Sequence, residues 1–157
     1  SQRILIDCGL FQGLKDLRQR NWAALPVDPT SIDAVVLTHA HIDHTGWLPR
    51  LVAQGFRGPV YCTGGTSDIC QLVLPDAAHL QEEDAKFANA RGYSKHHPAL
   101  PLYTKEDAAE ALSRLKPSPF GKKIAIGGSI TLTTQAVAKY IPSISNPRNH
   151  HAPIGEV

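Results

Sequence analysis

Four side chains of metal-binding type lie within six residues of one another: His39, His41, Asp43 and His44, in the stretch "THAHIDHTG". In an extended segment residues two apart point the same way, so His39 and His41 can direct their rings to one point. Asp43 and His44 follow at a turn, where they can reach a second point nearby. Two metal ions roughly 3.5–4 Å apart use four such ligands naturally.

The types of these four residues limit which metal ions they can bind. Imidazole and carboxylate are ligands that zinc accepts, and a carboxylate also suits manganese or iron. The alternative is a polar loop that is rich in histidine without binding anything. Ordinary turns use Gly, Asn and Pro, however, so the motif at the end of a buried strand favours a metal centre.

The apolar run before the motif predicts a buried strand over residues 32–39. A first strand is predicted over 3–9, "RILIDCG", where consecutive apolar residues indicate that both faces are covered. Such a strand usually has neighbours on both sides, so we expect sequence to be missing before residue 1. After the motif, residues 44–55 have helical spacing, with Pro49 in the first turn and Gly55 at the end.

The rest of the chain continues to alternate between strands and helices. The predicted elements are a short helix over 14–22 inside an irregular segment over 10–30, a strand over 58–63, a long helix over 67–90, a helix over 105–116 and a hairpin over 122–135. We expect a bend at Pro75 in the long helix. Thr104 and Asp107 are expected to form a capping pair at the start of the helix over 105–116, and Pro117 to end that helix. This order predicts an α/β layered domain.

Composition excludes several classes of protein. The 157 residues, 42% of them hydrophobic and 19% charged, suit one soluble domain. No apolar run approaches the roughly 20 residues of a spanning helix, and no secretion signal is visible, so we expect a cytoplasmic protein without a membrane segment. Cys8, Cys62 and Cys70 form no C-x-x-C pair, which favours reduced, buried thiols. The net charge of +2 says little about nucleic acid.

The motif resembles the H-x-H-x-D-H signature of the metallo-β-lactamase fold, and "ILIDCG" resembles the first motif of that family, with Asp7 as its acidic residue. The segment "GPVYCTGGTSDICQLVLPDAAHLQEEDAKFANARGY" and the later "PLYTKEDAAEAL" are similar to the β-CASP branch of RNA-processing and DNA-repair nucleases. The resemblance covers residues 3–135. Glyoxalase II shares the signature but not the segment that follows it.

The resemblance implies a fold, a reaction and a role for each residue. The fold would be an incomplete αββα sandwich over 1–135, with an irregular or divergent tail over 136–157. His39 and His41 would bind a first zinc ion, and Asp43 and His44 a second. Asp7 would orient a ligand histidine, so Asp7, Asp43 and His44 count as catalytic residues. The reaction would be hydrolysis of a phosphodiester in RNA.

Asp7 also has a purely structural interpretation, as a turn residue at the end of a strand and ahead of Gly9. The residues alone give the two interpretations similar weight, and the resemblance favours the site.

The end of the chain departs from the family pattern. A third motif, "GHxxGS", and then "SGD" are expected after the final hairpin, but "AVAKYIPSIS" stands there, with Lys139 or Tyr140 in place of a zinc-binding histidine. His150 and His151 suit an exposed tail better than a site. Three explanations stay open: a truncated chain, a frame change near Gln135, or a degenerate non-catalytic relative.

Other residues have ordinary interpretations. His79 is expected on a helix surface, and His96 and His97 in an exposed loop. The basic segment "LKDLRQR", residues 14–20, could contact a phosphate backbone if it is helical, but a solvated charged face is the preferred interpretation.

Two hypotheses of different class follow. The first is a zinc-dependent ribonuclease of the β-CASP type, of which this chain holds part of the active site. The second is a non-catalytic fragment or binding module that retains the fold, and a weaker third is an ester or thioester hydrolase. The sequence leaves open RNA or DNA as substrate, endo- or exonucleolytic cleavage, zinc or another metal, and monomer or dimer.

Overall fold

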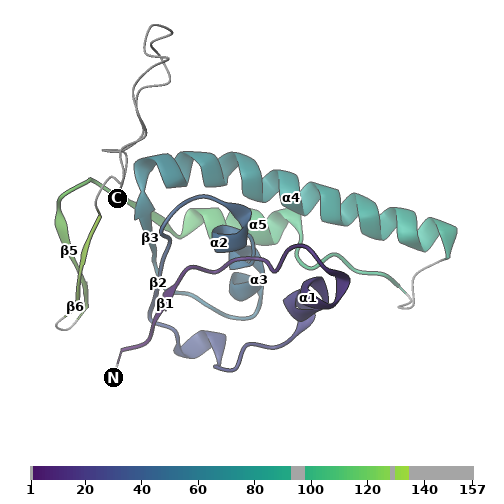
Figure 1. Ribbon diagram of the computed structural model, residues 1–157, viewed down its shortest axis with the longest axis horizontal. Helices are drawn as coiled ribbons and strands as arrows, with labels where there is room; N and C mark the ends of the chain where they lie inside the picture. The colour runs from purple at the N-terminus through teal and green to yellow at the C-terminus, as the bar shows by residue number, and fades with distance from the viewer. Residues whose placement is uncertain (1, 93–97, 128–129, 135–157) are drawn as a thin grey trace, which may run out of the picture.

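A parallel four-stranded sheet is the centre of the molecule, in a computed structural model that describes residues 2–92, 98–127 and 130–134. The strands follow the order β1-β2-β3-β4 across the sheet (Figure 1). Their bounds are Ile4–Ile6 for β1, Ala34–Val36 for β2, Val60–Thr63 for β3 and Leu115–Ser118 for β4. All three neighbouring pairs are parallel, so the carboxyl ends of the strands meet at one edge. The predicted α/β class is confirmed.

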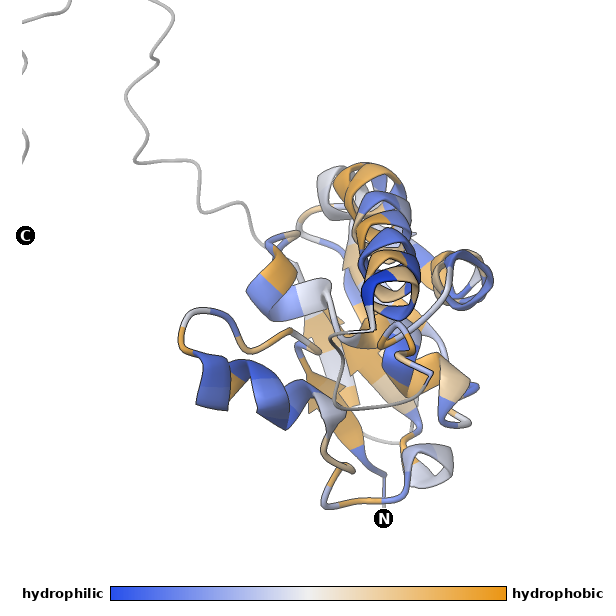
Figure 2. Cartoon of the chain, turned by 90° about the vertical axis from the view of Figure 1, so that its right-hand side faces the viewer, coloured by the Kyte–Doolittle hydropathy of each residue, from blue (hydrophilic) through white to orange (hydrophobic). Residues whose placement is uncertain are grey.

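Three helices cover one face of this sheet (Figure 1). They are α3 (Leu48–Ala53), α4 (Gly64–Arg91) and α5 (Lys105–Ser113). Val35 and Val60 of the strands are fully buried, as are Leu51 of α3 and Leu74 of α4. Figure 2 shows the strands near the centre of the molecule, largely in the colour of apolar residues. Burial of this apolar layer is the main favourable contribution to folding.

Short helices fill the connections. They are α1 (Lys15–Gln19) with the 3-10 turn η1 (Arg20–Trp22), a second 3-10 turn η2 (Pro29–Ser31), and α2 (Ile42–Thr45). The helix predicted over 14–22 is therefore confirmed. The helix predicted over 44–55 divides into α2 and α3, with Pro49 in the first turn of α3 and Gly55 at a positive φ of 112° after it.

The helix predicted over 105–116 is wrong at its end. It stops at Ser113, and Leu115–Ser118 form the strand β4 beside β3. The Val60 N–H donates to the Arg114 carbonyl at 3.0 Å, and Leu115 is buried in the core. Pro117 is compatible with the strand because β4 lies at the edge of the sheet, where a missing N–H breaks no ladder. Tertiary pairing therefore prevailed over helical spacing.

The capping pair and the long helix are confirmed, and the bend at Pro75 stays a prediction. Thr104 and Asp107 form a reciprocal capping box at the start of α5. The long helix begins three residues earlier than expected, at Gly64, where the Thr63 hydroxyl accepts a hydrogen bond from the Thr66 N–H at 3.2 Å. It runs through Pro75 as one helix (Figure 1).

The second neighbour of the first strand, expected from sequence before residue 1, stays a prediction. Of the described strands, only β2 pairs with β1, which lies at the edge of the sheet. Ile6 is 59% exposed, because it points to the face opposite the helices. The predicted hairpin is present as β5 (Lys123–Gly127) and β6 (Ile130–Thr133), which pair antiparallel. The tail over 136–157 lies outside the described residues.

Close backbone contacts hold α2 against the segment that follows β1. The Cys8 N–H donates to the His44 carbonyl at 2.7 Å, and the Leu10 N–H to the Ile42 carbonyl at 3.1 Å. Gly9 lies between these bonds, and a Cβ atom there would come 1.6 Å from the Asp43 carbonyl oxygen. Only glycine therefore permits this approach.

A Gly9→Ala substitution tests this contact. We expect a loss of at least about 2 kcal/mol in the free energy of unfolding, because neither backbone segment can give way without breaking its hydrogen bonds. Gly65→Ala is the matched control, since a Cβ atom there meets nothing within 4 Å and alanine favours the helix. Urea denaturation of both variants measures the difference. Equal stabilities would contradict the packing described.

Candidate metal centre

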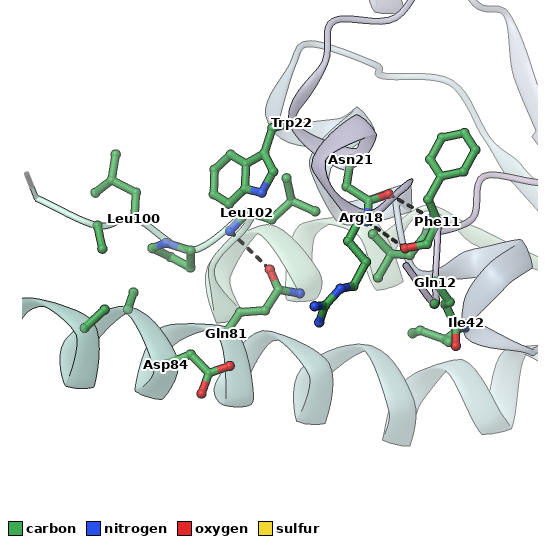
Figure 3. A pocket seen from close by; sticks show the side chains of 16 residues that line it. Phe11, Gln12, Arg18, Asn21, Trp22, Ile42, Gln81, Asp84, Leu100 and Leu102 are labelled. Atoms are coloured by element: carbon green, nitrogen blue, oxygen red, sulfur yellow. Dashed lines mark hydrogen bonds between the residues drawn. The ribbon is translucent and has the colours of Figure 1, made fainter. Parts of the chain in front are cut away.

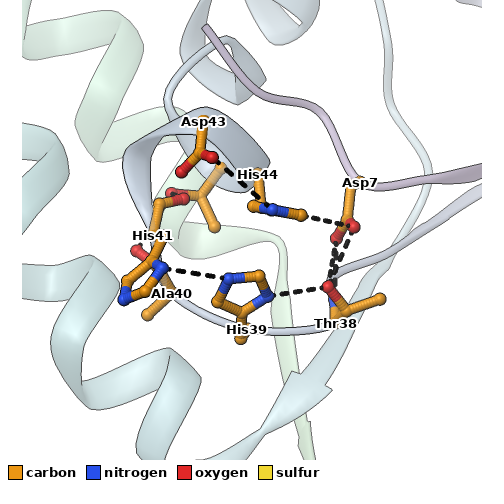
Figure 4. A network of polar contacts seen from close by, with 8 residues as sticks. Asp7, Thr38, His39, Ala40, His41, Asp43 and His44 are labelled. Atoms are coloured by element: carbon orange, nitrogen blue, oxygen red, sulfur yellow. Dashed lines mark hydrogen bonds and ion pairs between the residues drawn. The ribbon is translucent and has the colours of Figure 1, made fainter.

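The candidate ligands lie at the carboxyl edge of the parallel sheet. Asp7 directly follows β1, His39 is the third residue after β2, and His41 is the residue before α2 (Figure 4). Ala40 is buried in the core, whereas His41 is exposed and His39 half-buried. The alternation expected of an extended segment therefore turns both imidazoles outward.

His39 and His41 face one another through their ring nitrogens. His39 Nε2 and His41 Nδ1 are 3.2 Å apart, and the ring planes meet at 73°. Two ligand atoms on a tetrahedral zinc ion, each about 2.0–2.1 Å from the metal, are separated by about 3.3 Å. The pair thus has the spacing of two ligands that share one ion.

Asp43 and His44 form a second pair of donor atoms. Asp43 Oδ2 lies 3.7 Å from His44 Nε2, and the His44 ring centre is 3.9 Å from that of His39. Both side chains come from the single turn of α2, whose start at Ile42 turns the chain out of the extended conformation. Figure 4 shows the two donor pairs next to each other.

Asp7 connects the strand ends to the second pair. Its Oδ1 accepts a hydrogen bond from the Thr38 N–H at 2.8 Å, and its Oδ2 lies 2.8 Å from His44 Nδ1. Burial raises the pKa of Asp7, but hydrogen bonds from the Thr38 backbone and from the His44 and Thr38 side chains outweigh it, so the pKa lies below its ordinary value. Asp7 also has a φ of 58°, so it is a turn residue as well as a partner of His44.

The hydrogen bond to Asp7 has a consequence for His44. An ionised carboxylate only accepts hydrogen bonds, so the proton of a neutral His44 ring lies on Nδ1. The Nε2 lone pair is then directed toward Asp43. This is the tautomer that a metal ligand needs.

Thr38 is a residue that we did not single out from the sequence. Its hydroxyl lies 2.8 Å from Asp7 Oδ2 and 3.0 Å from His39 Nδ1. If the hydroxyl donates to the carboxylate, it accepts from His39 Nδ1–H, which leaves the His39 Nε2 lone pair facing His41. The signal in the sequence was a hydroxyl residue directly before the first histidine, and only the approach of Asp7 gives it meaning.

The donor atoms form pairs, and a complete site needs more of them. In the part of the chain that the structure describes, no three His, Cys, Asp or Glu side chains surround one ion position. A stable catalytic zinc site usually has three protein ligands. His39, His41, Asp43 and His44 therefore fit zinc as two incomplete sets, and the roles assigned to them from the sequence remain predictions.

The remaining candidates lie away from this cluster or outside the description. Cys8 is buried, and burial raises the pKa of its thiol, as it does for Cys62 and Cys70. His79 is exposed on α4. The other candidates lie outside the described residues: His96, His97, Lys139, Tyr140, His150 and His151. No helix in the described ranges is long and apolar enough to cross a membrane.

Comparisons with known proteins agree with the geometry. The family model described as the metallo-beta-lactamase superfamily matches residues 1–121. "Ribonuclease TTHA0252" of Thermus thermophilus is 40% identical over 126 residues, which cover 80% of this chain and 25% of the relative. Two proteins called "Transcription termination factor FttA" are 34% and 32% identical, from Cenarchaeum symbiosum and Methanocaldococcus jannaschii. Each match covers 83% of this chain.

The chain spans a quarter of the length of the ribonuclease and less than a fifth of the length of these two FttA proteins, at 18% and 19%. The predicted resemblance to β-CASP nucleases is confirmed by these relatives. Proteins of the matching family are metal-dependent, usually with zinc. The chain therefore belongs to the metallo-beta-lactamase superfamily, with β-CASP RNA-processing nucleases as its relatives.

Proposed function

We propose that this chain carries the first four metal ligands of a zinc-dependent ribonuclease of the β-CASP type. The observation that carries the proposal is the pairing of donor atoms, His39 with His41 and Asp43 with His44, at the carboxyl edge of the sheet. Zinc held by these pairs would supply positive charge to the phosphoryl oxygens and activate water for hydrolysis of a phosphodiester. The relative named as a ribonuclease supports RNA as the substrate.

The residues of this chain prepare the site for such an ion. Asp7 and Thr38 hold the His44 and His39 rings through their Nδ1 atoms, so both Nε2 atoms are directed at the ligand side. Asp43 is 54% exposed at its side chain, which leaves its carboxylate accessible to an ion and to substrate. We assign Asp7 a positioning role, and the two pairs the role of ligands to two zinc ions.

A non-catalytic module is the second candidate. The observation that favours it is the absence, within the described ranges, of a third ligand for either pair. Such a protein would bind zinc weakly and hydrolyse nothing. Three free, buried cysteines support a cytoplasmic location for either candidate.

Metal content distinguishes the two candidates. We expect the complete protein to bind zinc, and His39→Ala to lower the bound zinc by about one ion per chain, because His41 alone cannot hold the first ion. His79→Ala, a histidine on the exposed surface of α4, is the control and should keep the full content. Elemental analysis after gel filtration measures both. A His39→Ala variant with unchanged zinc would count against the proposed ligands.

Removal of the carboxylate beside His44 tests the positioning role. We expect Asp7→Asn to weaken zinc binding about 10- to 100-fold, as loss of a ligand's hydrogen-bond partner does in other metal sites. Asp33→Asn is the matched control, because Asp33 also accepts a backbone hydrogen bond, from the Arg3 N–H at 2.7 Å, at the opposite end of the strands. Competition with a chelating dye gives both affinities. If the two substitutions change zinc affinity equally, Asp7 has no positioning role and is only a turn residue.

The reaction class is tested with substrates. The complete protein should cleave single-stranded RNA, lose this activity with a chelator and regain it with zinc, because the phosphoryl group needs the metal charge. A nitrophenyl ester serves as the comparison substrate. Hydrolysis of the ester without cleavage of RNA would favour an ester or thioester hydrolase, and no hydrolysis of either would favour the non-catalytic module.

A further inference from the structure

A cavity of about 680 Å³ lies beside the metal centre, between α1 and η1 on one side and the C-terminal half of α4 on the other (Figure 3). Residues 99–102 close its end. Ile42, which lies in the chain between His41 and Asp43, forms part of its wall. The cavity thus begins at the helix that holds the candidate ligands and leads away from it.

Arg18 supplies a positive charge to this cavity. Figure 3 shows its side chain pointing into the space between η1 and α4. No other side chain or backbone group of the described ranges pairs with the guanidinium of Arg18. A smaller hollow of about 190 Å³ continues next to it and is lined by Lys15, Arg18, Gln19 and Trp22. Cations without a counter-ion along such a track favour a polyanion, and a guanidinium suits phosphate.

Trp22 supplies an aromatic wall shared by the two hollows. It is 51% exposed, although a tryptophan gains much from burial. The Arg50 guanidinium lies 5.8 Å from the Trp22 ring centre and donates to the Leu102 carbonyl at 3.0 Å, so the neighbouring wall is held in place. Exposed aromatic rings within a basic groove are the usual stacking surface for the bases of single-stranded nucleic acid.

Asp84 makes the two ends of the cavity differ in charge. It lies on α4 in the cavity wall, toward the Leu100 end and away from Ile42 (Figure 3). Its carboxylate repels phosphate but accepts hydrogen bonds from the N–H groups of a base. A phosphate therefore fits at Arg18, on the side of the metal centre, and a base fits at Trp22 and Asp84.

We infer that this cavity binds one nucleotide of single-stranded RNA next to the scissile phosphodiester, with its phosphate at Arg18 and its base on Trp22. The inference rests on the proposed ribonuclease function and adds to it a place for the strand. It converts the basic segment over 14–20, expected above to be a solvated charged face, into part of the substrate path. The alternative is that a protein segment, instead of RNA, binds in the same cavity.

Binding of a labelled uridine oligonucleotide to the complete protein, with zinc removed by a chelator, tests the stacking contact. We expect Trp22→Leu to weaken binding about 5- to 150-fold, which corresponds to the loss of one stacked base. Trp22→Phe should retain most of the affinity because it keeps an aromatic face. Phe120→Leu is the matched control, since Phe120 is also an exposed aromatic residue, at 58%, but lies outside both hollows.

The salt dependence of RNA binding tests the proposed contact between Arg18 and a phosphate. Arg18→Gln should reduce the slope of log affinity against log salt by about 0.7, the value for one phosphate contact on a single strand. Lys122→Gln, at an exposed position after β4, should leave the slope unchanged. Because the Arg18 side chain has no partner in the described ranges, this variant reports on RNA even if Trp22→Leu does not fold.

An RNA with one abasic nucleotide locates the base. In the cleavage assay, the abasic site should raise the KM of the parent protein at one position relative to the cleaved bond and have no further effect in Trp22→Leu. If the parent protein cleaves RNA and the Trp22 and Arg18 variants bind it unchanged, the inference is overturned while the ribonuclease stands. If Trp22→Leu releases a protein segment from this cavity but still binds RNA with the parent's affinity, the inference is also overturned. If the parent protein neither binds nor cleaves RNA, the proposed function itself fails.

Discussion

The carboxylate of Asp7 is the interaction on which the site depends. It receives hydrogen bonds from the backbone and hydroxyl of Thr38, just after β2, and a contact from the His44 ring, so it joins two strand ends to α2. Its backbone N–H also extends the sheet, donating to the Val36 carbonyl at 2.8 Å. A half-buried charge would otherwise be costly, but here several donors stabilise it. Through them one acidic group determines which nitrogen of two histidines is available.

The fold brings these groups together because parallel strands deliver their carboxyl ends to one edge. Asp7 and Thr38 are 31 residues apart in the chain but adjacent in the sheet. The close approach at Gly9 then presses α2 against the end of β1, and the helix carries Asp43 and His44 to the same edge. Helices α3, α4 and α5 bury the apolar face of the sheet under residues such as Leu51 and Leu74, which keeps the strand ends in register.

Sequence reasoning succeeded where spacing along the chain decides the structure. The outward direction of His39 and His41, the capping box at Thr104 and the hairpin near the end follow from local geometry. It failed at Leu115, whose helical spacing to Ala111 suggested a longer helix, because pairing with Val60 in a distant strand is the stronger constraint. It gave Trp22 no role and placed Arg18 on a solvated charged face, since the opposite wall of their cavity comes from α4, more than fifty residues later in the chain.

The sequence by itself determined the kinds of donor atom and their spacing, and with them the family, because a ligand motif within six residues needs no distant partner to be read. Only the tertiary structure decided that Thr38 joins Asp7 to His39 and that the donors form two pairs within the described residues. It also decided that a basic segment and an aromatic ring border a cavity beside the metal centre. These features depend on contacts between residues far apart in the chain, which local spacing does not encode.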